Sequence, residues 1–149
     1  MIALKPMLPE SVQKLGHTNL SIGVDLVFIP EFRKALEEPG TAFFDKTFTS
    51  WELAKASTKS MPERAVFFSG RYSAKEAFVK ALDGPRLHLP PAFRFLYSEI
   101  EIRNDEFGRP YCRFYGSLSD YMKKTGSSVI SLSITHVEEY AFSEILLSL

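Results

Sequence analysis

One long helical segment constrains the fold of this chain more than any other feature. The pattern predicts a helix from about Glu63 to Leu82, because Pro62 fits a first helical turn and Asp83-Gly84-Pro85 ends the segment. Small and aromatic residues recur along it at positions that suit a buried stripe: Ala65, Phe68, Ala74, Ala77, Phe78 and Ala81. We therefore expect a long helix packed on a second layer.

Period-two patterns predict that this layer is a mostly antiparallel sheet. The segment 21–29 places Ile22, Val24 and Leu26 on one face and Gly23, Asp25 and Val27 on the other. The segment 129–135 places Val129, Ser131, Ser133 and Thr135 on one face and Ile130, Leu132 and Ile134 on the other. Residues 140–147 are expected to return beside it, after a turn at 136–139.

Turn and cap signals place the remaining elements. Residues 99–103 and 110–115 flank Asp105-Glu106-Phe107-Gly108 and predict a hairpin. Pro30 opens a predicted helix that Pro39-Gly40 ends, and Thr49 with Glu52 has the spacing of a capping box. A short helix is predicted from Gly116 to Gly126. The fold class is therefore α+β, with an N-terminal extension at 1–20 and one domain at 21–149.

Composition excludes several classes of function. Eighteen basic and eighteen acidic residues cancel, which argues against nucleic acid as the main ligand. The sequence shows no secretory leader and no apolar run of membrane-spanning length. The single cysteine, Cys112, fits a reducing compartment, so we expect a cytoplasmic protein without a membrane partner.

Asp25 is the first residue that suggests chemistry. It is a carboxylate within the apolar run Ile22-Gly-Val-Asp-Leu-Val, where a charge is costly unless it is paired, hydrogen-bonded or bound to metal. Taken alone, this residue is explained more simply by an exposed strand face or a salt bridge.

The long helix carries a second carboxylate among cations. Glu76 and Lys80 are four residues apart and share a face, and Arg71 and Lys75 lie nearby. A surface ion pair is one reading, and a capping box of Ser73 with Glu76 is another. The mixture also suits a diphosphate with Mg²⁺, since the carboxylate would hold the metal and the cations would neutralise phosphate oxygens.

Other motifs narrow the field. His136 ends the strand Ser131-Leu-Ser-Ile-Thr-His, and a lone histidine there is more often structural than catalytic. The sequence has no phosphate-binding GxxxxGK[ST] loop, no GxGxxG fingerprint and no GxSxG elbow. Three histidines and one cysteine without metal spacing make a zinc site improbable.

In their order, these segments resemble the holo-acyl carrier protein synthases, the small members of the 4′-phosphopantetheinyl transferase superfamily. The resemblance covers roughly residues 21–147. It rests on these pieces: Ile22-Gly-Val-Asp25-Leu-Val, Phe48-Thr-x-x-Glu52, Gly70-Arg-Tyr-Ser-Ala-Lys-Glu-Ala-Phe-Val-Lys-Ala-Leu82, Ile100-Glu-Ile, Gly108-Arg-Pro110, Ser133-Ile-Thr-His136 and Tyr140-Ala.

The resemblance implies a Mg²⁺-dependent transferase, with Mn²⁺ as the alternative metal, that moves phosphopantetheine from coenzyme A (CoA) to a serine of an apo acyl carrier protein. It implies a homotrimer with CoA bound between subunits. Asp25 and Glu76 would ligate the metal and act in catalysis with Lys80. The implied CoA-binding residues are Arg71, Lys75, Gly84, Arg109, Pro110, Ser133, Thr135 and His136, with Gly108-Arg109-Pro110 reaching the site from the adjacent subunit.

This chain departs from the family pattern at three places. Glu31 stands where the family carries an arginine that is thought to meet the acidic helix of the carrier. The loop after Leu82 is longer and includes Arg86 and His88, and the extension at 1–20 is unusual. Two alternatives follow: another enzyme of diphosphate substrates on this scaffold, and an inactive homologue that binds CoA or a carrier.

Overall fold

The structure is a computed structural model that describes residues 19–38, 40–91 and 93–149. The helices and strands run in the order β1 Leu20–Phe28, α2 Ile29–Glu37, α3 Phe43–Thr47, α4 Ser50–Ser57, α5 Met61–Asp83, the 3₁₀ helix η1 Tyr97–Glu99, β2 Ile100–Asn104, β3 Pro110–Phe114, α6 Gly116–Thr125, β4 Ser128–Val137 and β5 Tyr140–Ser148. The predicted extension at 1–20 lies outside the described residues except for its last two positions. The α+β class is confirmed.

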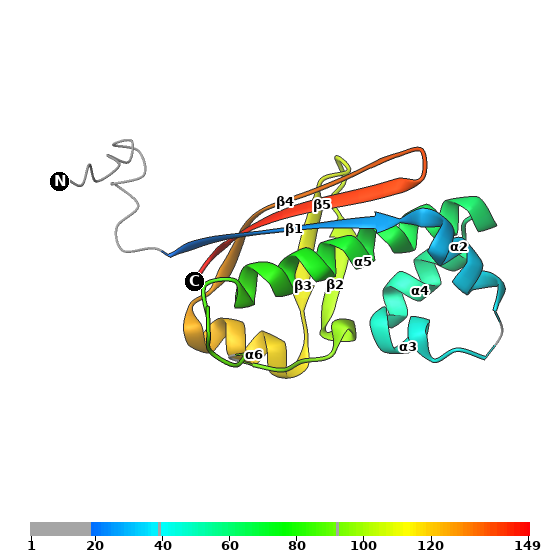
Figure 1. The fold of residues 1–149 in the computed structure, drawn as a ribbon. Helices are drawn as coiled ribbons and strands as arrows, with labels where there is room; N and C mark the ends of the chain where they lie inside the picture. Colours follow the sequence, from blue (N-terminus) through cyan, green and yellow to red (C-terminus); the bar gives the residue numbers. More distant parts are fainter. Residues whose placement is uncertain (1–18, 39, 92) are drawn as a thin grey trace.

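Two antiparallel sheets surround α5. One has the strand order β1-β5-β4, and the other is the β2–β3 hairpin. Figure 1 shows the three-stranded sheet along one side of α5, with α6 on the other side and the hairpin crossing the helix. The main core joins all of them, because buried residues of α5 pack with Ile102 of β2, Leu118 of α6 and Ile145 of β5.

The long helix has the predicted course. It begins at Met61 and ends at Asp83, and every residue of the predicted stripe is buried. The backbone N–H of Ser60 donates to Glu63 Oε2 at 3.0 Å, which caps the first turn. The alternative start at Ser73 is wrong: the Ser73 hydroxyl instead donates to the backbone oxygen of Asp25 at 2.9 Å.

Strand β1 lies directly against the backbone of α5. A Cβ atom added to Gly23 would come within 1.9 Å of the Ala77 carbonyl oxygen, so only glycine permits this approach. The Ser21 hydroxyl donates to the Ala81 carbonyl at 2.6 Å and fixes the N-terminal end of the contact. Residues 23 and 25 share a face of the strand, so the Asp25 side chain also faces α5.

On β1, the other face of the three-stranded sheet is apolar and exposed. Ile22 and Leu26 are 60% and 61% exposed, and Val24 and Phe28 continue the same row. Neighbouring strands follow this face in register, with Leu146 of β5 opposite Ile22. The predicted division of β1 into two faces is thus confirmed, but the face with larger side chains is the exposed one.

A bulge changes the predicted faces of β4. The register shifts between Val129 and Ser131, so Val129 packs on the core and Ile130 is 51% exposed. The predicted pairing of Val129 with Ser131 on one face, and of Ile130 with Leu132 on the other, is therefore wrong. Ser131, Ser133 and Thr135 do share a face.

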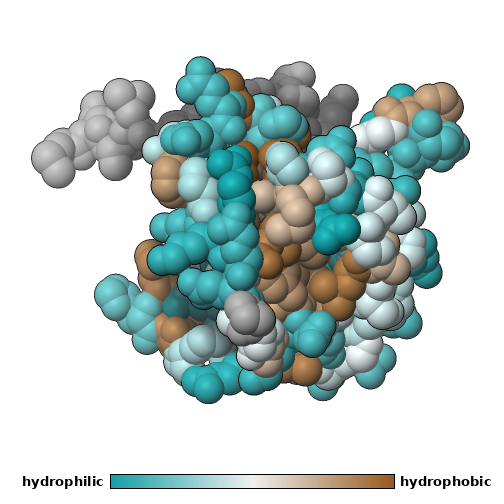
Figure 2. Space-filling view, turned by 90° about the vertical axis from the view of Figure 1, so that its right-hand side faces the viewer, coloured by the Kyte–Doolittle hydropathy of each residue, from teal (hydrophilic) through white to brown (hydrophobic). Residues whose placement is uncertain are grey.

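Helices α2, α3 and α4 gather around the first half of α5. Their aromatic side chains form a second cluster in which Phe32, Phe48 and Phe68 are buried. The predicted capping box is present at α4, with Thr49 Oγ1 accepting from the Glu52 N–H at 3.2 Å. Figure 2 shows this side of the molecule, where apolar atoms gather in the middle of the face between hydrophilic margins.

Candidate active site

Asp25 lies where β1 passes the second half of α5. Its Oδ1 accepts from Lys80 Nζ at 2.7 Å, and the Asp25 side chain is 13% exposed. Burial raises the pKa of the Asp25 carboxyl, and the negative charge of Glu76 adds to this, although the Lys80 ammonium opposes both. Ionisation of Asp25 therefore costs free energy, and a second cation near the carboxylate would reduce this cost.

Glu76 lies beside Asp25, on the same side of α5. Its Oε1 accepts from the Tyr97 hydroxyl at 2.8 Å. Burial and the Glu76 carboxylate raise the pKa of Tyr72 to about 12, with a smaller contribution from Asp25. The same causes raise the pKa of Tyr97. Two carboxylates, two phenols and one lysine therefore share one site.

The ion pair in this site differs from the simplest reading of the helix. Glu76 and Lys80 have the spacing of a pair along one helix, yet Lys80 pairs with Asp25 across to β1. The Lys80 side chain is 53% exposed, so its ammonium remains accessible to an incoming anion.

The two carboxylates fit a hard divalent cation. They are partly buried, they repel each other, and they supply oxygen ligands only. Among residues 19–38, 40–91 and 93–149 no group of three or more His, Cys, Asp or Glu side chains could hold a metal. A metal at Asp25 and Glu76 would thus have two protein ligands, as Mg²⁺ does when substrate oxygens and water complete its shell.

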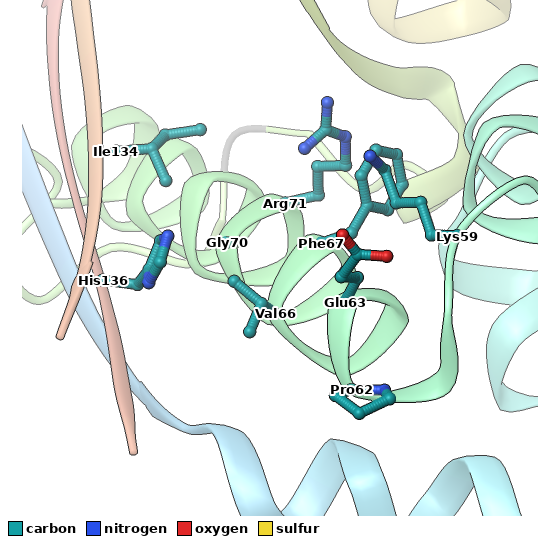
Figure 3. A pocket seen from close by; sticks show the side chains of 9 residues that line it. All are labelled: Lys59, Pro62, Glu63, Val66, Phe67, Gly70, Arg71, Ile134 and His136. Atoms are coloured by element: carbon teal, nitrogen blue, oxygen red, sulfur yellow. The ribbon is translucent and has the colours of Figure 1, made fainter. Parts of the chain in front are cut away.

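A cavity of about 460 Å³ lies between the first half of α5 and β4. Its lining includes Arg71, His136 and Lys59, and Figure 3 shows His136 and Ile134 pointing from the strand toward the helix. The volume suits a small ligand. Two predicted site residues, Arg71 and His136, are thus brought together although 65 positions separate them in the sequence.

Arg71 is held in this cavity with donor capacity to spare. Its guanidinium lies 3.6 Å from the centre of the Phe67 ring, and Nη2 donates to Asn104 Oδ1 at 3.0 Å. Its Nε is buried and has no hydrogen-bond partner in the described part of the chain. Burial lowers the pKa of Arg71 to about 10, so it is still a cation at neutral pH. A partly buried cation that lines a cavity suits an anionic ligand.

The other predicted CoA-binding residues are not in this cavity. Ser133 and Thr135 project from the opposite face of β4 to His136, since the latter is paired with buried Ala141. Gly84 caps the far end of α5, and Arg109 and Pro110 lie in the β2–β3 hairpin, with the Arg109 side chain 76% exposed. Of these residues, Pro110 is near Arg71, because it pairs with Asn104, whose side chain accepts from Arg71.

The assignment of Lys75 to CoA is wrong for this structure. Its side chain is fully buried and forms an ion pair with Glu52 Oε2 at 2.7 Å. Nζ also donates to the backbone oxygens of Thr47 and Tyr97, at 2.7 and 3.2 Å. These three acceptors satisfy its three donors, so the ammonium has none left for a phosphate.

Sequence reasoning missed three residues of the site: Lys59, Tyr72 and Tyr97. Lys59 precedes α5 by two residues, and Tyr72 lies four residues before Glu76, a spacing that places both on one helix face. Tyr97 had no such signal, because it reaches the site from η1, 21 residues beyond Glu76.

Comparison with known proteins agrees with this fold. The model of the 4′-phosphopantetheinyl transferase superfamily matches residues 21–143. The holo-[acyl-carrier-protein] synthase of Mycolicibacterium paratuberculosis is 38% identical over 123 residues, which is 82% of this chain and 91% of the relative. That of Mycobacterium tuberculosis is 36% identical over 118 residues, 78% of this chain and 87% of the relative.

Solved structures are similar over the same region. The apo synthase of Chronobacterium ammoniagenes has a TM-score of 0.78 and 32% identity, covering 88% of this chain and 97% of the other. Its complex with CoA has a TM-score of 0.76 and 32% identity, covering 87% and 97%. The chain therefore belongs to the 4′-phosphopantetheinyl transferase superfamily, and within it to the holo-[acyl-carrier-protein] synthases.

Proposed function

We propose that this chain transfers 4′-phosphopantetheine from CoA to a serine of an apo acyl carrier protein and releases 3′,5′-ADP. The observation that carries the proposal is the pair of carboxylates, Asp25 and Glu76, held together beside Lys80. Along the same helix, Arg71 and His136 line a cavity large enough for part of a nucleotide. This arrangement supplies the positioning and charge neutralisation that phosphoryl-type transfer requires.

The reaction is a displacement at the β-phosphorus of CoA. The serine Oγ forms a bond to this phosphorus, and the bond from the phosphorus to the bridging oxygen breaks, so that the bridging electron pair leaves with 3′,5′-ADP. Glu76, or a water that it orients, accepts the serine proton. Lys80 stands half-exposed beside the carboxylates and neutralises charge that develops on the diphosphate.

Asp25 and Glu76 would hold Mg²⁺, with Mn²⁺ as a substitute. When bound, the metal would offset the negative charge of the two carboxylates and of the diphosphate. Asp25 is suited to this role because its burial already disfavours an uncompensated charge.

CoA binding is assigned first to Arg71 and His136. The guanidinium of Arg71 would donate to a CoA phosphate, and His136 would line the nucleotide pocket from β4. Ser133, Thr135, Gly84, Arg109 and Pro110 would take part only where a neighbouring subunit completes the site.

A homotrimer would bring such neighbours together. Strand β1 exposes a row of four apolar side chains, Ile22, Val24, Leu26 and Phe28. Single exposed apolar residues are normal on a protein surface, whereas a contiguous row indicates an interaction surface. Its burial between copies of the chain is consistent with a closed symmetric assembly. We also propose a cytoplasmic location, with which the single, partly buried cysteine, Cys112, is consistent. In the described part of the chain, no helix is long and apolar enough to cross a membrane.

The test is to incubate the protein with CoA, Mg²⁺ and a panel of apo carrier proteins and to measure the intact mass of each carrier. We expect one carrier to gain a single phosphopantetheine arm on its serine. A panel is needed because Glu31 is exposed at the start of α2, where the family carries an arginine. If no carrier gains mass while CoA still binds, the chain is a binding homologue and the proposal fails.

A further inference from the structure

A tyrosine outside the family motifs makes a direct hydrogen bond to a proposed metal ligand. The Tyr97 hydroxyl donates to Glu76 Oε1 at 2.8 Å, and it reaches α5 from η1, after the long loop that follows this helix. The phenol occupies one oxygen of the carboxylate and leaves the second for the metal or the attacking serine.

The main chain at Tyr97 is anchored by the residue next to Glu76. Lys75 Nζ donates to the Tyr97 carbonyl at 3.2 Å, and the same ammonium is paired with Glu52. Glu52 Oε1 in turn accepts from the Ile102 N–H at 2.8 Å, so the buried pair also holds β2, which follows η1 directly. Adjacent residues of α5 thus hold the two ends of Tyr97, Lys75 its carbonyl and Glu76 its hydroxyl.

The ring of Tyr97 is also constrained from its sides. It lies between Phe95, 6.4 Å between ring centres, and Tyr72, 6.1 Å between ring centres. Tyr97 is only half-buried, so water could satisfy its hydroxyl and core packing does not require the bond to Glu76. The bond is therefore not needed to satisfy the Tyr97 hydroxyl, and its main effect is to orient the Glu76 carboxylate.

We propose that Tyr97 is a positioning residue, whose hydroxyl orients the Glu76 carboxylate for the metal and the attacking serine. This inference rests on the proposed function, in which Glu76 is a metal ligand. It predicts that loss of the hydroxyl impairs the chemical step and metal binding but not the binding of CoA.

The test is Tyr97→Phe, which keeps the ring and removes the hydroxyl. We expect kcat for carrier modification to fall about tenfold or more, the factor for losing a hydrogen bond to a charged group, with KM for CoA unchanged. Mn²⁺ binding to the protein without CoA, followed by electron paramagnetic resonance, should weaken. The matched control is Tyr115→Phe, which removes a 2.9 Å bond to Glu101 and should change neither quantity.

An unchanged kcat, an unchanged Mn²⁺ affinity, or a raised KM for CoA alone would each overturn the inference. Glu76→Gln, assayed in parallel, separates this failure from that of the proposed function. If Glu76→Gln keeps its activity, the role of Glu76 is wrong. If Glu76→Gln is inactive while Tyr97→Phe behaves as the parent, only the positioning role is wrong.

Discussion

At the scale of single residues, Lys75 and Glu76 are adjacent on one helix but have different roles. Glu76 faces the candidate site, whereas Lys75 points into the interior and forms a fully buried pair with Glu52. A buried pair contributes little net stability relative to apolar residues, but loss of one partner leaves an uncompensated charge.

Lys75→Met should therefore lower the free energy of unfolding by about 3–5 kcal/mol, since the Glu52 carboxylate would remain buried and unpaired. Urea denaturation measures this loss. The double variant Lys75→Met with Glu52→Gln should recover much of it. A Lys75→Met protein as stable as the parent would show that the pair is not buried as described.

Arg71→Ala should act on CoA binding. Removal of a partly buried cation from the cavity should raise KM for CoA about tenfold or more with little effect on kcat, as expected for the loss of a hydrogen bond to a charged ligand. Steady-state kinetics at varied CoA checks this. Arg94→Ala, which removes an exposed arginine in the loop before η1, is the control and should leave KM unchanged.

Glu101 gives the protein a predictable dependence of stability on pH. Its side chain is buried, which would raise its pKa, but hydrogen bonds from Thr49, Arg103 and Tyr115 outweigh burial and hold the pKa below its ordinary value. The stabilisation of the folded state by Glu101 is therefore complete above the ordinary glutamate pKa, and it is lost as pH falls through the lowered pKa of the folded state.

Glu101→Gln tests this sign. The parent should exceed the variant in unfolding free energy at neutral pH, and the difference should narrow on acidification below the ordinary glutamate pKa. Urea titrations at several pH values measure it. A difference that stays constant with pH would contradict the assignment.

At the scale of elements, the contact of β1 with α5 sets the geometry of the site. Gly23 permits the strand to touch the helix backbone, and Asp25, two residues on, then faces the same helix. The Ser21 and Ser73 hydroxyls, which both bond to main-chain oxygens across the contact, hold the two elements together.

Gly23→Ala should separate these elements. The added methyl would overlap the Ala77 carbonyl, which cannot move without displacing the helix, so we expect a loss of at least about 2–3 kcal/mol and much reduced activity. Thermal unfolding measures the stability. Gly70→Ala is the matched comparison, because its methyl meets only the Ile134 side chain, at 3.2 Å, and should cost far less. Equal effects would contradict the close approach.

Elements with local signals were predictable from sequence. The capping box at Thr49, the hairpin around Gly108 and the Gly126 helix end each depend on a few neighbouring residues. Helix α3 was missed because its five residues are too few to show a period. The β4 bulge was missed because the alternation of residues 129–135 is regular in the sequence and the extra residue is accommodated by pairing with β5.

The candidate site was predictable only in part, for a related reason. Family motifs pointed to Asp25, Glu76, Arg71 and His136. The fold brings Asp25 together with Glu76, and Arg71 together with His136. The spacing of Arg71, Lys75 and Glu76 could not say which side chain points inward, since the partner of Lys75, Glu52, lies on another helix. The position of Tyr97 depends on the path of the long loop between α5 and η1, and the sequence has no periodic signal that predicts this path.

At the scale of the whole molecule, the exposed apolar face of β1 determines how a neighbouring subunit could complete the site. If the protein is a trimer through this face, light scattering should give the mass of three chains. Leu26→Glu, which places a charge on a side chain that is 61% exposed, should then give a smaller species with weakened CoA binding. A parent protein that is monomeric yet fully active would exclude an intersubunit site.

The central claim is that Asp25 and Glu76 support transfer from CoA to a carrier. The most direct measurement is the release of 3′,5′-ADP by the parent protein and by Asp25→Ala and Glu76→Ala, with circular dichroism to check folding. We expect both variants to fold. Ionised Asp25 costs the folded state free energy because it is partly buried, and its partner Lys80 is half-exposed and can be solvated without it. We predict release by the parent only when Mg²⁺ and an apo carrier are both present, and none above background by either variant. Near-normal release by a folded Asp25→Ala or Glu76→Ala protein would contradict the account.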